Sequence, residues 1–88
     1  MDILIIGGGG REHAIAWKVS KSNKVSKIYV APGNPGIKSE NKVYLIEVKD
    51  PTVEDYLKIA KEKNIDLTIV GPEAPLVEGI VDEFTKKL

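Results

Sequence analysis

The sequence lacks cysteine, a net charge and any long hydrophobic run. Without cysteine, a disulfide framework, a thiolate metal site and a thiol nucleophile are excluded, and we expect a reducing, cytoplasmic location. Thirteen Lys and Arg balance thirteen Asp and Glu, which argues against nucleic acid or an anionic membrane as a partner. The longest aliphatic run, residues 3–6, is far shorter than the roughly 20 residues that span a bilayer.

The chain is also short. Its 88 residues predict a single domain, residues 1–88, whose modest core is small for an enzyme that must enclose two substrates and a nucleotide. The hydrophobic share of 42% and the clear periodicity argue against disorder. No basic segment precedes the first aliphatic run, so we expect Met1 to be the true start rather than part of a cleaved signal peptide.

Short β-branched runs alternate with helical patterns, which indicates parallel βαβ units. The first and last runs are almost wholly aliphatic, as in strands covered on both faces. Two prolines and two glycines exclude regular structure from residues 32–36. The expected strands are residues 2–6, 27–31, 43–48 and 67–70. The first expected helix covers residues 11–22, and the third runs from near Pro75 to the end. The second has its N-cap at Asp50 or Thr52 and stops at Asn64 in a left-handed conformation.

Each expected helix carries an apolar side at helical spacing. We expect Trp17, Tyr56 and Phe84 to be core aromatics. The apolar sides comprise Ala14, Ile15, Trp17, Lys18 through its stem, and Val19 in the first helix; Val53, Tyr56, Leu57 and Ala60 in the second; and Val77, Ile80, Val81, Phe84 and Leu88 in the third.

These elements predict an α/β fold, a small doubly wound and mainly parallel sheet. If the fourth strand pairs with the first, the strand order is 3-2-1-4 and a topological switch lies between strands one and four. Ligands of open α/β sheets bind at such a switch, beyond the carboxyl ends of the strands. Two loops, residues 7–12 and 71–75, flank it.

Four consecutive glycines, residues 7–10, join the first strand to the first helix. They allow backbone N–H groups at the helix N-terminus to approach an anion. Arg11 supports this interpretation, because a cation in the first turn is unfavourable unless an anion binds nearby. In the alternative, one or two glycines make the turn and the others permit close helix–sheet packing. We favour the phosphate site.

Two familiar nucleotide loops do not fit. The third small residue of a dinucleotide fingerprint would fall on Glu12 or His13, and no acid for a ribose occurs between His13 and Ser39. Neither glycine-rich stretch continues as a P-loop. The loop is therefore interpreted as a phosphate or ribose-phosphate site of another kind.

Four polar residues have two interpretations each. Glu12 is either a first-turn acid facing the helix dipole or a hydrogen-bond partner of a sugar hydroxyl or amine. His13 is more readily a structural, hydrogen-bonded residue than a general base. Asn34 either tolerates left-handed geometry or contacts substrate. Glu73 either caps a helix or supplies a carboxylate at the end of a buried strand, beside Gly71 and Pro72.

Three motifs closely resemble the amino-terminal domain of the phosphoribosylamine-glycine ligase (glycinamide ribonucleotide synthetase) family. They are GGGGREHA at residues 7–14 followed by Trp17, APGNPG at residues 31–36, and VGPEAPL at residues 70–76. The similarity covers essentially all 88 residues.

The resemblance implies an ATP-grasp ligase that joins glycine to 5-phosphoribosylamine in de novo purine synthesis, with ATP going to ADP and phosphate. This chain would be its pre-ATP-grasp, Rossmann-like domain, without the ATP-grasp and carboxy-terminal domains. ATP and Mg or Mn would bind mainly elsewhere, so we expect no catalytic or metal-binding residue and no activity here. The substrate-binding residues expected are Gly8, Gly9, Gly10, Arg11, Glu12, Asn34, Pro72 and Glu73.

Two other functions stay open. The chain could be a stand-alone phosphate- or ribose-phosphate-binding regulatory module. It could also be a subunit that completes another chain, as in a split enzyme, rather than a fragment of a larger ligase. A separate protein with an ATP-grasp region but without this domain would favour the split enzyme.

Overall fold

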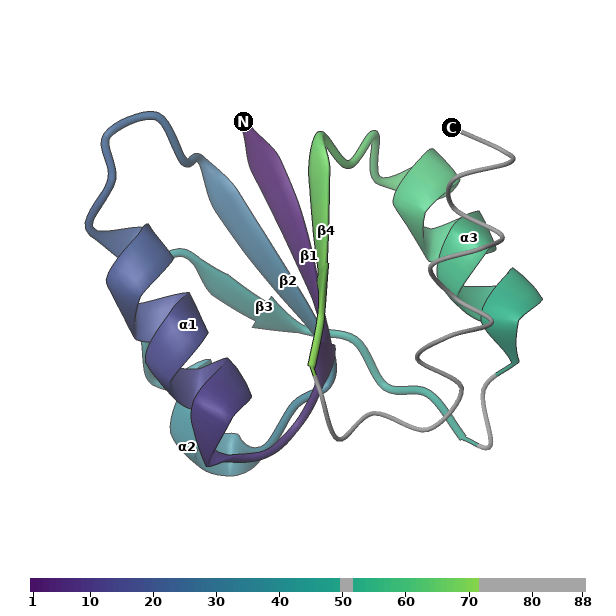
Figure 1. Ribbon diagram of the computed structural model, residues 1–88, viewed down its shortest axis with the longest axis horizontal. Helices are drawn as coiled ribbons and strands as arrows, with labels where there is room; N and C mark the ends of the chain where they lie inside the picture. The colour runs from purple at the N-terminus through teal and green to yellow at the C-terminus, as the bar shows by residue number, and fades with distance from the viewer. Residues whose placement is uncertain (50–51, 72–88) are drawn as a thin grey trace.

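The computed structural model describes residues 1–49 and 52–71, which form a parallel sheet with helices on both faces (Figure 1). Pro72, Glu73, Phe84 and the third expected helix lie outside the described residues. The strands are β1 (Asp2–Gly7), β2 (Lys27–Pro32), β3 (Val43–Leu45) and β4 (Leu67–Val70), and the helices are α1 (Gly10–Ser20), α2 (Pro35–Lys38) and α3 (Val53–Glu62).

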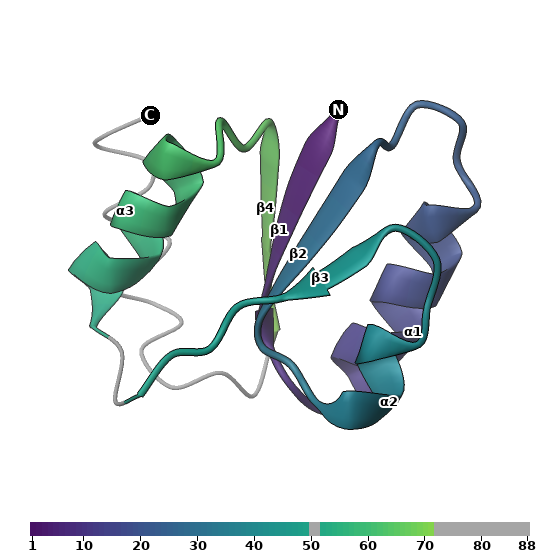
Figure 2. The same ribbon diagram turned by 180° about the vertical axis from the view of Figure 1, so that it is seen from behind.

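The strand order is β3-β2-β1-β4, and every neighbouring pair is parallel. This confirms the predicted α/β fold, order and switch between β1 and β4. The helices α1 and α2 cover one face of the sheet, and α3 covers the other, as Figures 1 and 2 show from opposite sides. The chain thus changes faces between β3 and β4, which opens the switch at the carboxyl end of β1.

The strand β1 contributes to a hydrophobic core on each face. Its four aliphatic residues are at most 2% exposed, as predicted for a strand covered on both sides. Alternation along the strand divides them. The core beneath α1 and α2 contains Ile3, Ile5, Ala16, Val25, Ile28, Val30 and Ile37, and the core beneath α3 contains Leu4, Ile6, Ala31, Tyr56, Leu57 and Ala60.

Both ends of α3 follow from the sequence. Thr52 is the N-cap and forms a capping box with Asp55, so Thr52 rather than Asp50 begins the helix. Asn64 has a φ of 52°, which confirms the left-handed stop.

Tyr56 is buried as predicted, and desolvation, with a smaller contribution from the Asp55 carboxylate, raises the pKa of its hydroxyl. None of the helices in residues 1–49 and 52–71 has the length and hydrophobicity to cross a bilayer.

The buried face of α1 agrees with the prediction only in part, since Ile15 and Val19 pack against the core as expected. Trp17 is 47% exposed rather than a core residue, with the Lys21 Nζ 4.5 Å from its ring centroid. The buried stripe is instead Glu12, Ala16 and Ser20. Small side chains at the last two positions let the helix lie close to the sheet, and the bulk of Trp17 is accommodated outside. An apolar count places Trp17 in the core because it rewards size rather than fit.

Three further expectations need correction. β3 ends at Leu45 rather than at residue 48. β4 is an edge strand of the described sheet and is only half-buried, with Leu67 46% exposed. The segment expected to be irregular contains the start of α2, because Pro35 at the first helical turn needs no amide partner and Asn34 precedes it as N-cap.

Candidate functional site

The loops that follow β1 and β2 are joined by two hydrogen bonds. The Gly33 amide donates to the Gly7 carbonyl at 3.0 Å, and Asn34 Nδ2 donates to the Gly8 carbonyl at 2.6 Å. A Cβ on Gly8 would lie 2.7 Å from the Gly33 carbonyl oxygen. Close approach of the two loops therefore requires glycine at position 8, a contact between loops rather than the helix–sheet packing considered for part of the glycine run.

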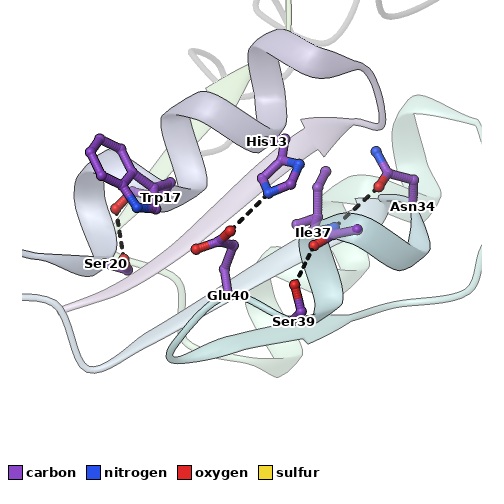
Figure 3. Close-up of polar contacts among 8 residues, drawn as sticks. His13, Trp17, Ser20, Asn34, Ile37, Ser39 and Glu40 are labelled. Atoms are coloured by element: carbon purple, nitrogen blue, oxygen red, sulfur yellow. Dashed lines mark hydrogen bonds and ion pairs between the residues drawn. The ribbon is translucent and has the colours of Figure 1, made fainter.

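Asn34 uses both ends of its amide within the protein. Besides its bond to Gly8, its Oδ1 accepts a 3.1 Å hydrogen bond from the Ile37 amide and so caps α2 (Figure 3). Its φ of −152° is extended, so the left-handed interpretation of Asn34 is wrong. An N-cap needs extended backbone, and the positive φ in this loop, 69°, falls on Gly33.

Glu12 occupies the switch between β1 and β4. It lies in the first turn of α1, as predicted, but is only 3% exposed. A Cβ on Gly7 would lie 2.7 Å from Glu12 Cγ, and a Cβ on Gly71 would lie 2.7 Å from Glu12 Cδ. Side chains of the first turn point back toward the helix N-terminus, which brings this carboxyl group over the ends of both strands.

The outer part of the glycine loop is open. Gly9 is the N-cap of α1 and has no side chain that could accept a hydrogen bond from the helix amides. The first amide with a partner inside the helix is that of His13, which donates to the Gly9 carbonyl at 3.1 Å. The amides of Gly10, Arg11 and Glu12 precede it and have no acceptor inside the helix. Gly10 and Arg11 are exposed, and a Cβ on Gly10 would meet no atom within 4 Å.

His13 forms a hydrogen bond with Glu40, Nε2 to Oε1, at 2.9 Å (Figure 3). The bond agrees with a structural role for His13 near the helix start. Glu40 was not identified from the sequence, because no local pattern relates residues 27 positions apart. The pair connects α1 to the turn that follows α2.

The expected substrate-binding residues are thus only partly brought together. Gly8, Gly9, Gly10, Arg11, Glu12 and Asn34 lie around one edge of the sheet, whereas Pro72 and Glu73 are outside the described residues. In residues 1–49 and 52–71, no three His, Asp or Glu side chains are grouped to hold a metal ion. We assign these residues no step that uses a metal ion.

The different surroundings of two glycines give a stability test. Gly8→Ala is expected to destabilise the protein by about 1–3 kcal/mol, because its methyl group would overlap the Gly33 carbonyl. Gly10→Ala is expected to stabilise it by roughly 0.4–1 kcal/mol, because the added methyl group has space and alanine favours the helix. Urea unfolding of both variants measures the difference, and equal effects would contradict this assignment of the loop.

Comparison with known proteins supports a specific relationship. Residues 1–88 match the model of a family described as phosphoribosylglycinamide synthetase, N domain. The chain is similar to phosphoribosylamine-glycine ligases of Clostridium acetobutylicum (53% identity over 87 residues, 99% of this chain) and Haemophilus influenzae (55% over 84 residues, 96% of this chain). It spans 20% of the length of each of these relatives. The chain belongs to the phosphoribosylglycinamide synthetase N-domain family.

Proposed function

We propose that this chain, as one domain of residues 1–88, is the substrate-binding part of a cytoplasmic, ATP-dependent ligase of purine biosynthesis. The ligase joins glycine to 5-phosphoribosylamine and forms glycinamide ribonucleotide. The observation that carries the proposal is the open N-terminus of α1 beside a buried carboxyl group at the strand switch. Family membership and the names of the similar ligases support the choice of substrate.

The charges at this edge favour one orientation of phosphoribosylamine. The exposed Arg11 and the free helix amides attract the phosphate to the outer part of the loop. The Glu12 carboxylate, buried further in, repels a phosphate and instead accepts hydrogen bonds from the amine or a sugar hydroxyl. The phosphate thus points outward, and the amine points toward the switch between β1 and β4.

We propose that the remaining candidates also contribute to substrate binding. Asn34 borders the loop and holds Gly8 in place, and Pro72 and Glu73 follow Gly71 directly in the sequence. We assign Glu73 a second carboxylate contact to the sugar or amine. ATP and Mg or Mn bind mainly to other parts of the ligase.

The domain contributes to the reaction by positioning the nucleophile. In the ligase, ATP phosphorylates the glycine carboxylate, the phosphoribosylamine nitrogen attacks the acyl carbon, and phosphate leaves. Holding the phosphate at one end and the amine at the other fixes the nitrogen for attack, which is an orientation effect. We assign the chain no phosphoryl-transfer group and expect it to be inactive by itself.

Arg11→Ala in the complete ligase tests the phosphate contact. A charge-assisted hydrogen bond contributes about 1.5–3 kcal/mol, so the KM for phosphoribosylamine is expected to rise by roughly 10- to 100-fold. The KM for ATP is expected to stay unchanged. Lys18→Ala, which removes an exposed cation from the last turn of the same helix, is the matched control. No rise in the phosphoribosylamine KM, or an equal rise for ATP, would reject the proposal.

A further inference from the structure

The short helix α2 is attached at both ends to the structure that carries the glycine loop. At its start, Asn34 caps α2 and donates to the Gly8 carbonyl. At its end, Glu40 hydrogen-bonds to His13 in α1, and the Glu40 amide donates to the Ile37 carbonyl at 3.0 Å. Figure 3 shows the Asn34 cap at the start of α2 and the bond between Glu40 and His13 beyond its end. The loop conformation and the placement of α2 are therefore coupled.

The bonds to the β2 loop set the direction of two amides. In a trans peptide the carbonyl and the N–H of one plane point in opposite directions. Because Asn34 holds the Gly8 carbonyl, the Gly9 N–H points away from the β2 loop. Because Gly33 holds the Gly7 carbonyl, the Gly8 N–H points away as well. Two consecutive donors are thus oriented before a ligand arrives.

We propose that His13 and Glu40 are positioning residues for the phosphoribosylamine site, an inference that rests on the proposed function. Their side chains are 36% and 23% exposed, so the pair is partly shielded from water. The His13 ring also packs against α2, because its Cε1 atom would lie 3.5 Å from a Cβ atom added to Gly36. The pair fixes the far end of α2, and α2 transmits this constraint through Asn34 to Gly8.

Glu40→Ala in the complete ligase tests this role. Loss of one hydrogen bond costs about 0.5–1.5 kcal/mol, so we expect the KM for phosphoribosylamine to rise about two- to tenfold. The kcat at saturation and the KM values for ATP and glycine are expected to stay unchanged. Glu40→Gln keeps an oxygen acceptor for His13 Nε2 and is expected to restore most of the affinity.

Two comparisons separate positioning from general stability. Glu62→Ala removes an exposed acid that pairs with Lys58 on α3 at 3.9 Å, and we expect no change in the phosphoribosylamine KM. Asn34→Ala is expected to raise that KM as well, and the Asn34→Ala/Glu40→Ala double variant to raise it by less than the product of the single effects, because both residues act through α2.

The outcomes distinguish this inference from the proposed function. If Arg11→Ala raises the phosphoribosylamine KM while Glu40→Ala behaves like Glu62→Ala, the positioning role is overturned and the substrate site stands. If Glu40→Ala changes the KM of all three substrates equally, or if Glu40→Gln gives no recovery, the role is likewise overturned. If Arg11→Ala is also without effect, the proposed substrate site itself fails.

Discussion

Gly71→Ala is expected to destabilise the protein by about 1–3 kcal/mol, and most of this loss is expected to disappear when Glu12 is also replaced by alanine. A methyl group on Gly71 would overlap the Glu12 carboxyl group, with its Cδ only 2.7 Å away. The Glu12→Ala replacement removes the closest of these atoms and leaves the Ile6 carbonyl oxygen, 3.0 Å from the added carbon. A double-mutant cycle measured by urea unfolding isolates this interaction from the effect of losing Glu12 alone.

Gly7→Ala is the matched variant for the same cycle. It also overlaps Glu12, but Gly7 in addition has a φ of 137°. Such backbone costs a residue with a side chain roughly 1–3 kcal/mol, and Glu12→Ala cannot relieve that strain. We therefore expect Glu12→Ala to rescue Gly71→Ala more fully than Gly7→Ala. Equal loss for Gly71→Ala with and without Glu12 would contradict the position assigned to the carboxyl group.

Gly9→Val in the complete ligase is expected to raise the KM for phosphoribosylamine far more than the KM for ATP. A valine side chain at the N-cap covers the amides that the phosphate approaches, and losing two charge-assisted bonds corresponds to roughly a hundredfold or more. The backbone of Gly9, with φ −90° and ψ −173°, is one that valine adopts readily. The substitution therefore introduces no backbone strain at Gly9.

Ala14→Val is the control for Gly9→Val. It introduces the same side chain at an exposed position of α1, where valine costs only a few tenths of a kcal/mol in helix propensity. Its KM values are expected to match those of the unchanged ligase. Equal increases in the KM for ATP and for phosphoribosylamine in Gly9→Val would reject a phosphoribosylamine site at this loop.

The parts of the fold that follow local rules could be predicted from the sequence. A run of aliphatic residues specifies β1 as a strand covered on both faces. Thr52 and Asn64 mark the ends of α3 because caps depend on nearby backbone alone. The strand order could be predicted only on the condition that the fourth strand pairs with the first, which the structure confirms.

The remaining features depend on contacts between distant segments. Ala16 rather than Trp17 faces the sheet because the helix approaches it closely, a requirement that α1 alone does not reveal. Asn34 and Glu40 act through partners 26 and 27 residues away. In the candidate site, the sequence predicted that the groups of the glycine loop act together, but it could not show that Glu12 is enclosed by Gly7 at the end of β1 and Gly71 just after β4.

The outward position of Trp17 has a practical consequence for spectroscopy. It is the single tryptophan of the chain. Nearly half of its surface is exposed to water, and the Lys21 ammonium group lies over its ring. Its fluorescence in the native state will resemble that of a hydrated indole and will change little as the chain denatures. Circular dichroism is the better signal for denaturation, whereas a blue shift of the indole emission will report anything that covers the outer side of α1.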